Sequence, residues 1–273
     1  MPTPSHHENV QPADPGRARN PLLVIAHPGH ELRILGWMRR MRPLVCVLTD
    51  GSGSRDEGRL ESTTRVLEHT GATAGPVYGV MSDKEVYAAI LGHDHDRFTR
   101  LADDLAGVIA SSGADCVVGD AIEGYNPSHD VCRLVINAAV RMASRGGAAP
   151  SNYDYLLVGP PGECAVELRD RAYFLQLDDA ALDDKLQAAR CYPELTAEVD
   201  HALDKFGLAP FRIECLRPSD HTSRYGWDPA VTPAYESFGE QRVAAGVYRD
   251  VLRFREHVMP LADALWTHSE RGA

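Results

Sequence analysis

Short apolar segments that each run without interruption alternate along this chain with longer amphipathic segments. Continuous apolar character is typical of strands buried on both faces of a parallel sheet, whereas a half-exposed strand would alternate apolar and polar residues. The predicted strands are PLLVIAH (21–27), PLVCVLTD (43–50), ADCVVGD (114–120) and YDYLLVGP (153–160). The predicted helices between them span roughly residues 30–41, 57–70, 95–111 and 129–144. This order predicts an α/β fold with a doubly wound, mostly parallel sheet.

The rest of the chain divides into a polar N-terminal segment and a C-terminal extension. Residues 1–20 are polar and rich in proline, so we expect a mobile tail followed by a single domain over residues 21–273. Residues 175–273 show no obvious core of their own, and we expect them to wrap the sheet. The extension is predicted to contain two short helices interrupted at Pro193, a strand at 211–218 and a helix over 239–268 with Val247 on its buried face.

Composition restricts the setting in which the chain works. No segment reaches the roughly 18–20 apolar residues of a membrane-spanning helix, and the N-terminal segment lacks the apolar centre of a signal peptide. The six cysteines show no CxxC spacing, which disfavours a disulfide framework and indicates a reducing, cytoplasmic location. The net charge of −11 argues against binding to nucleic acid or to an anionic membrane surface.

Histidines stand where two of the predicted strands end. AHPGHE, residues 26–31, places His27 at the end of the first strand and His30 at the start of a helix, with a Pro-Gly turn that can bring both rings together. His129 follows the strand ADCVVGD in the segment EGYNPSHD. Ligands bind at the C-terminal ends of the strands in such sheets, so the three imidazoles form a candidate site for a transition metal. The spacing alone leaves open that the first two are an inert surface pair.

Four motifs together resemble those of the PIG-L/LmbE-like family of metal-dependent N-deacetylases, over roughly residues 20–160. They are AHPGHE at 26–31, TDG at 49–51, Arg59 in the following helix, and NPSH at 126–129 before a helix. The family's first motif reads AHPDDE and its last reads HPDH. The resemblance implies a Rossmann-like fold that hydrolyses the acetamide of N-acetylglucosamine-type substrates, usually with zinc. It also implies metal-ligand positions for His27, His30 and His129 and a substrate-binding position for Arg59.

The chain departs from the family at the residues that handle protons. Gly29 stands where the family has an Asp that acts as general base, and His30 stands where it has an anionic ligand. Asn126, which we assign to substrate binding, replaces a His that assists catalysis, and Ser128 replaces an Asp. The site is therefore expected to be more cationic by one charge. Three neutral imidazoles around zinc can lower the pKa of bound water to about 7, so that hydroxide forms without a dedicated base.

Amide cleavage would then need a proton for the leaving amine, and nearby groups can be ranked by sequence. Glu123 is the first candidate and Glu31 the second, while the hydroxyl of Tyr125 could polarise the amide carbonyl. A structural alternative stays open for Glu31, which could orient a ligand instead. Asp130 is interpreted mainly as stabilising the start of a helix.

The sequence therefore predicts a metal-dependent hydrolase that cleaves an amide on an amino sugar or a related small polar substrate. Its cofactor would be one divalent transition metal, zinc in the first place and iron as the alternative. Two further hypotheses remain. One is a non-hydrolytic metalloenzyme, for example iron-dependent, on the same fold. The other is a non-catalytic binding protein, since both of the family's usual proton-handling residues are replaced.

Overall fold

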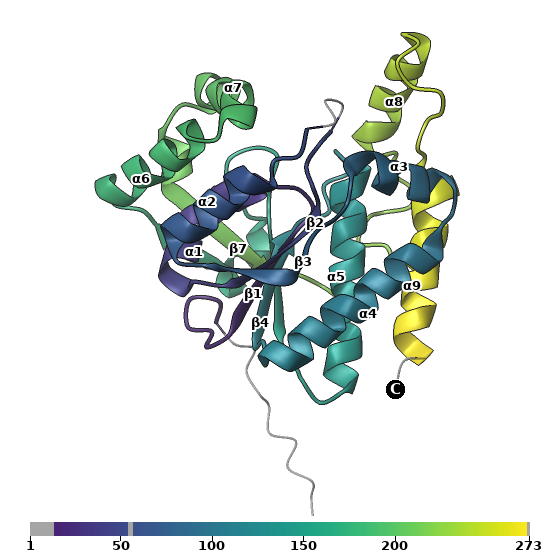
Figure 1. Ribbon diagram of the computed structural model, residues 1–273, viewed down its shortest axis with the longest axis horizontal. Helices are drawn as coiled ribbons and strands as arrows, with labels where there is room; N and C mark the ends of the chain where they lie inside the picture. The colour runs from purple at the N-terminus through teal and green to yellow at the C-terminus, as the bar shows by residue number, and fades with distance from the viewer. Residues whose placement is uncertain (1–13, 54–56, 272–273) are drawn as a thin grey trace, which may run out of the picture.

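A computed structural model of the chain describes residues 14–53 and 57–271. Within these residues seven strands form one sheet in the order β3-β2-β1-β4-β5-β7-β6 (Figure 1). The strands are β1 (Pro21–Ile25), β2 (Leu44–Thr49), β3 (Thr73–Met81), β4 (Cys116–Asp120), β5 (Ser151–Tyr155), β6 (Tyr173–Gln176) and β7 (Ile213–Pro218). Strands β1 to β5 pair in parallel, and β7 and β6 add an antiparallel edge. The predicted α/β fold with a mostly parallel sheet is confirmed.

Strand order reverses between β1 and β4, which are neighbours in the sheet although more than 90 residues separate them. The chain moves outward from β1 through β2 to β3, and then returns to the other side of β1 to form β4 and β5. The connections that leave β1 and β4 therefore diverge to opposite faces. In doubly wound sheets, ligands bind at the point where the connections diverge in this way.

Helices cover both faces of the sheet (Figure 1). One face carries α1 (Leu35–Met41), α2 (Leu60–Thr70) and α6 (Asp179–Arg190), and the other carries α4 (His95–Ser112), α5 (Pro127–Arg145) and α9 (Met259–Arg271). The shorter helices are α3 (Asp83–Leu91), α7 (Thr196–Phe206) and α8 (Ala234–Ala244). At the end of the sheet where the parallel strands terminate, α7 and α8 rise on opposite sides (Figure 1).

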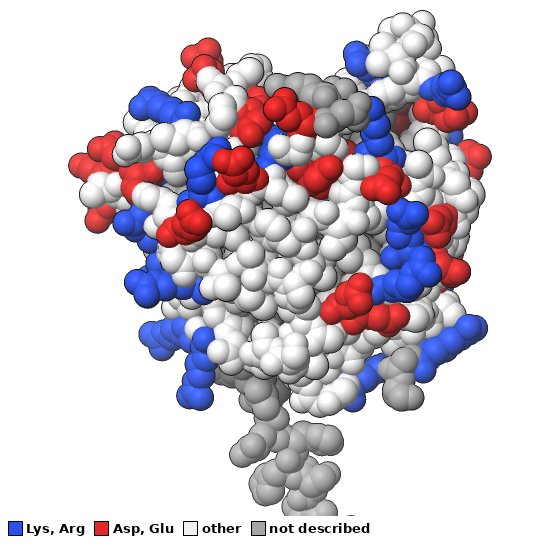
Figure 2. Space-filling model, viewed as in Figure 1, with Lys and Arg blue, Asp and Glu red and all other residues white. Residues whose placement is uncertain are grey.

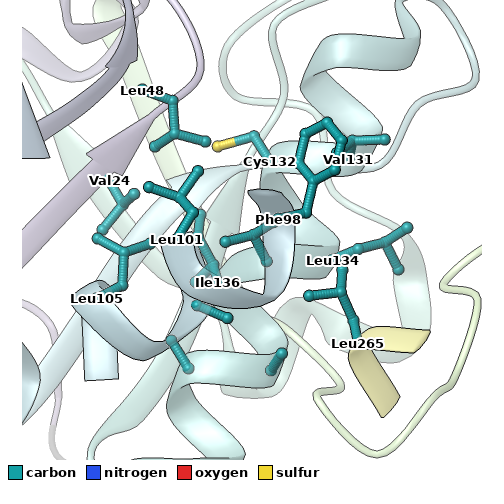
Figure 3. Close-up of a cluster of buried hydrophobic side chains, with 14 of the residues drawn as sticks. Val24, Leu48, Phe98, Leu101, Leu105, Val131, Cys132, Leu134, Ile136 and Leu265 are labelled. Carbon is teal, nitrogen blue, oxygen red and sulfur yellow. The ribbon is translucent and has the colours of Figure 1, made fainter. Parts of the chain in front are cut away.

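The larger core lies between the sheet and helices α4, α5 and α9. Figure 3 shows Val24 and Leu48 of the sheet facing Phe98 and Leu101 of α4, with Ile136 of α5 beside them. Each is buried, and full burial of one such side chain contributes about 1.5–3 kcal/mol. Packing of this density fixes the positions of β1, β2 and α5, and these elements carry the candidate site.

Residues 14–20 do not behave as the mobile tail that the sequence predicted. The backbone carbonyl of Pro15 accepts a hydrogen bond from the indole Nε1 of Trp37 at 2.8 Å. The carboxylate of Asp115 accepts from the backbone N–H groups of Arg19 and Asn20 at 2.8 and 3.1 Å. These contacts hold the segment against the bottom of the sheet. Residues 1–13 of the predicted tail lie outside the described residues.

The C-terminal extension is tied to the first half of the chain by a buried ion pair. Lys185 of α6 contacts the carboxylate of Glu214 in β7 at 2.7 Å, and both side chains are buried. The same carboxylate accepts hydrogen bonds from the backbone N–H groups of Gly36 and Trp37 at the start of α1. Lys185 also donates to the carbonyl of Arg33. Residues of α6 and β7 therefore close the first turn of α1.

Several elements differ from the sequence prediction. The pattern predicts no element over residues 71–91, which form β3 and α3, and none at β6. The helix predicted over 239–268 is wrong, because α8 ends at Ala244 and a π-helix (Phe254–Val258) precedes α9. Gly246 lies at the break with a φ of +70°, and Val247, expected on the buried face, is 51% exposed.

All six cysteines are free thiols. No helix in the described ranges is long and apolar enough to span a bilayer.

Candidate metal centre

The three histidines predicted as ligands lie together at the C-terminal ends of β1 and β4. His27 follows β1, His30 begins a short 3-10 helix (His30–Ile34), and His129 lies in the first turn of α5. The ring centroids are 5.2 Å apart for His27 and His30, 5.0 Å for His27 and His129, and 4.5 Å for His30 and His129. Residues more than 100 positions apart in the sequence thus form one cluster.

These distances can be compared with those of imidazoles that share an ion. With metal–nitrogen distances of about 2.1 Å, two imidazoles on one tetrahedral ion have ring centroids about 5 Å apart. The spacing of the three rings fits that arrangement. However, the rings lie edge to face at angles of 64–89°. Among the described residues, no group of three or more His, Cys, Asp or Glu side chains is arranged so that it could hold a metal ion as it stands. Metal binding would therefore require the rings to turn so that their nitrogens converge.

Two of the three rings are anchored through their Nδ1 atoms to buried carboxylates. Nδ1 of His30 lies 2.9 Å from Oδ2 of Asp120, the last residue of β4. Nδ1 of His27 lies 2.8 Å from Oδ1 of Asp83, the first residue of α3, and 2.7 Å from the hydroxyl of Thr49. Imidazoles that bind metals typically use one ring nitrogen for the ion and donate the other N–H to a carboxylate or carbonyl.

The electrostatics of the cluster favour neutral imidazoles. Burial lowers the pKa of His30, although the neighbouring Asp120 favours its charged form. Burial also lowers the pKa of His129 well below its ordinary value, and the positive charges of His30, His27 and Arg59 lower it further. Only a neutral imidazole has a lone pair to offer a metal, so near neutral pH these two rings are in the form a ligand requires.

Arg59, predicted to bind substrate, lies close enough to the cluster for its charge to act on two of the imidazoles. It is the N-cap residue of α2, and its backbone N–H donates to the carbonyl of Asp50 at 2.8 Å. Its guanidinium charge contributes to the lowered pKa values of His30 and His129. Its Nε atom is buried and has no hydrogen-bond partner within the described chain. A donor of this kind is available for an anionic or hydroxyl-bearing group.

Glu31 turns away from the histidines. Its side chain accepts hydrogen bonds from the backbone N–H of Gly29 at 2.7 Å and from the hydroxyl of Thr63 at 2.8 Å. Burial raises the pKa of Glu31 to about 7. Both carboxyl oxygens are engaged in holding the turn that carries His27 and His30 against α2. These contacts correspond to the structural alternative for Glu31.

Glu123 is also engaged in contacts with the protein. Its two carboxylate oxygens accept hydrogen bonds from the backbone N–H groups of Leu157 and Val158 at 2.8 and 3.1 Å. The segment after β5 is thereby fixed to the segment after β4, and burial raises the pKa of the carboxyl. In turn, Oδ1 of Asp130 accepts from the backbone N–H groups of Glu123 and Gly124. Glu123, the first candidate for proton delivery, thus links the loop after β4 to the loop after β5.

The two remaining predicted residues, Tyr125 and Asn126, directly precede α5. Asn126 is the N-cap of α5, and its side-chain oxygen accepts from the backbone N–H of Ser128 at 2.9 Å, which leaves its amide group as the part that could meet a substrate. Tyr125 is 61% exposed, and its hydroxyl forms no hydrogen bond with the described residues. Of the three groups predicted to act on protons or on the carbonyl, only this hydroxyl is free.

At Gly29, where the resembled motif has an Asp, the backbone conformation and a neighbouring side chain both disfavour a larger residue. Gly29 has a φ of +104°, a conformation that residues with side chains rarely adopt. A Cβ atom at this position would lie 2.3 Å from Cδ1 of Leu195 and 3.6 Å from the ring of Tyr192. Both belong to the segment between α6 and α7 in the C-terminal extension. Residues of the C-terminal extension therefore pack over the turn that carries His27 and His30.

The charge around the site is not basic. On the face shown in Figure 2, acidic side chains predominate toward the upper end, where the parallel strands terminate, and Lys and Arg lie mostly toward the sides and the lower end. The buried carboxylates of Asp83 and Asp120 add negative charge directly behind two of the imidazoles. The expectation that the site is more cationic by one charge is therefore offset by groups outside the family motifs.

Sequence reasoning missed these two carboxylates. Asp120 was used only as the end of a strand, although a buried Asp beside the end of β1 is a recognisable signal. Asp83 was missed together with β3, which presents no continuous apolar run because it contains Pro76 and two glycines. Thr49, the third partner of the cluster, was within the TDG motif but was not assigned a role.

The sequence matches no protein-family model and no curated protein. Among solved structures, the chain is similar to a triple mutant of a deacetylase involved in the teicoplanin biosynthetic pathway, with 16% identity and a TM-score of 0.50 over 73% of this chain and 97% of that chain. The deacetylase of the A40926 pseudoaglycone gives 16% identity and a TM-score of 0.49 over 75% of this chain and 98% of that chain. At this identity the first likeness establishes the fold, and the chemistry has to be argued from this chain's own residues.

Proposed function

We propose that this chain is a metal-dependent hydrolase that cleaves an amide on an amino sugar or a related small polar molecule. The convergence of His27, His30 and His129 at the end of the sheet supports this proposal most strongly. These residues would hold one divalent transition metal, for which zinc is our first choice and iron the alternative. When bound, such an ion supplies Lewis-acid activation of water and of the amide carbonyl.

The chain's own residues would divide the remaining tasks among them. Arg59 presents an unpaired Nε atom beside the histidines and is proposed to bind a hydroxyl, phosphate or carboxylate of the substrate. Tyr125 has a free hydroxyl at the exposed edge and is proposed to contact the carbonyl or the leaving amine. The contacts of Glu31 and Glu123 favour supporting roles, in which they hold the loops that carry the ligands.

The proposal is tested by measuring metal content and hydrolysis together. Wild-type protein, purified without a tag and without added metal, is expected to contain about one equivalent of zinc or iron by elemental analysis. His129→Ala should lose this metal and the release of carboxylic acid from a panel of N-acylated amino sugars. His201→Ala, at an exposed position of α7, is the matched control and should change neither. Full metal occupancy in His129→Ala would show that the site is assigned wrongly.

Two outcomes would select the alternative hypotheses. Iron with activity toward oxygen and no amide cleavage would favour a non-hydrolytic metalloenzyme. A protein that takes up no metal even after reconstitution, but binds an amino sugar, would favour the binding-protein hypothesis. The second outcome is consistent with the engagement of both glutamates in structural contacts.

A further inference from the structure

Two buried carboxylates lie behind the histidine cluster, and neither belongs to the motifs that carry the family resemblance. Asp120 faces His30 across 2.9 Å, and Asp83 faces His27 across 2.8 Å. Nδ1 of His30 is hydrogen-bonded to Asp120, whereas Nδ1 of His27 is hydrogen-bonded to the hydroxyl of Thr49 at 2.7 Å and also lies close to Oδ1 of Asp83, a buried oxygen with no other partner among the described residues. In both rings Nδ1 faces the carboxylate, which leaves Nε2. The two pairs come from different elements, since Asp120 ends β4 and Asp83 begins α3.

Asp120 is itself held rigidly. Its side chain is fully buried, and Oδ2 also accepts a hydrogen bond from the backbone N–H of Ala26 at 2.7 Å. Its other oxygen accepts from the hydroxyl of Tyr155 in β5 at 3.2 Å. Three neighbouring strands thus determine where this carboxylate lies. A ring that donates to it is fixed relative to the sheet.

Asp83 is held in a comparable way from the opposite side of the site. Its Oδ2 accepts from the backbone N–H of Gly53 at 2.7 Å, and the hydroxyl of Thr49 also interacts with its carboxylate. The residue opens α3 directly after Ser82, which caps that helix with its side chain and forms a capping box with Glu85. The position of Asp83 is therefore set by the helix start and by the loop after β2.

We propose that Asp120 and Asp83 are positioning residues that hold His30 and His27 as Nδ1–H tautomers and leave both Nε2 atoms for a metal ion. This inference rests on the proposed metal centre. Neutral imidazole has two tautomers, and an acceptor fixed at one nitrogen selects which nitrogen keeps its lone pair. Carboxylates in this position also make the ligand more basic, and replacing such a group typically costs about 10–100-fold in metal affinity.

The third ligand lacks such a partner. The ring of His129 contacts the other two rings but forms no hydrogen bond with a side chain of the described chain. No acceptor on a described side chain therefore fixes the orientation of this ring, in contrast to those of His27 and His30.

The test measures metal affinity in Asp120→Asn and Asp83→Asn, with Asp154→Asn as the matched control. Asp154 lies in β5 and pairs with Arg217, without contacting a histidine. Affinity for Zn²⁺ is determined by competition with a chromophoric chelator at neutral pH. The two test variants are expected to bind Zn²⁺ about 10–100-fold more weakly than wild type, and the control is expected to match wild type.

A second measurement reads the tautomers directly. Long-range ¹H–¹⁵N correlation spectra of wild type, recorded with a metal chelator, should show His27 and His30 protonated at Nδ1, while the Zn²⁺ affinities separate a positioning role from a merely structural one. It needs no variant, so it decides the matter even if Asp120→Asn fails to fold. Nε2–H tautomers at both rings, or unchanged Zn²⁺ affinity in both variants, would overturn this inference alone. Wild-type protein that binds no metal would overturn the proposed function as well.

Discussion

Replacing Gly29 by Ala should destabilise the fold through two separable effects. The first is backbone strain, because the φ of +104° at this position costs a residue with a Cβ atom about 1–2 kcal/mol. The second is a clash, because the new Cβ atom would lie 2.3 Å from Cδ1 of Leu195. That atom is the end of a flexible, partly exposed side chain that can shift, so the clash should add only about 1 kcal/mol, the lower end of the cost of overpacking. The free energy of unfolding should therefore fall by about 2–3 kcal/mol.

A matched glycine in the same chain separates the two effects. Gly147 has a φ of +95°, and a Cβ atom there would meet nothing within 4 Å. Gly147→Ala should therefore show only the strain, so the difference between the two variants in urea unfolding measures the clash. Removing the clashing atoms with Leu195→Ala should make a subsequent Gly29→Ala substitution cost about as much as Gly147→Ala does. Equal losses for Gly29→Ala and Gly147→Ala in the wild-type background would refute the reasoning.

Two further predictions concern buried charges. Lys185→Met leaves the Glu214 carboxylate without its cation, and should cost about 3–5 kcal/mol in urea unfolding, toward the lower end because two backbone N–H groups remain. A Lys185→Met/Glu214→Gln protein no more stable than the single variant would contradict this. Burial raises the pKa of Asp130 to about 7, so the metal-free folded state holds a proton that the unfolded chain releases near pH 4. This group should therefore lower the free energy of unfolding as pH rises from about 4 to 7, and Asp130→Asn should remove that contribution. Unfolding curves that keep the wild-type dependence on pH would contradict the assignment.

The elements predicted well are those in which local pattern and tertiary environment agree. β1, β2 and β4 are buried on both faces, and their continuous apolar runs identified them directly. β3 is an edge strand with only two buried residues, so it needs no apolar run and tolerates Pro76, which would be excluded from a central strand. The helix predicted over 239–268 failed because apolar spacing continued through Gly246, where the backbone leaves helical geometry.

The candidate site was likewise predictable only where its residues follow from the local pattern. His27, His30 and His129 could be brought together from sequence because parallel strands end at one edge of the sheet. The carboxylates beside these histidines could not be predicted from the sequence. Asp83 lies next to His27 only because of a strand and a helix that the pattern did not reveal. Likewise, the hydrogen bonds of Glu123 depend on the segment after β5 lying beside that after β4.

The fold of the extension gives a physical reason why the site departs from the family motif at Gly29. Leu195 occupies the space above this glycine, and the neighbouring Tyr192 is anchored through its hydroxyl to Thr63, which also donates to Glu31. Glu31 in turn accepts from the backbone N–H of Gly29, so the turn between the two histidines is held from both sides. An Asp in this place would require a left-handed backbone and the displacement of Leu195. Proton transfer in the proposed hydrolysis would therefore depend on residues other than Gly29.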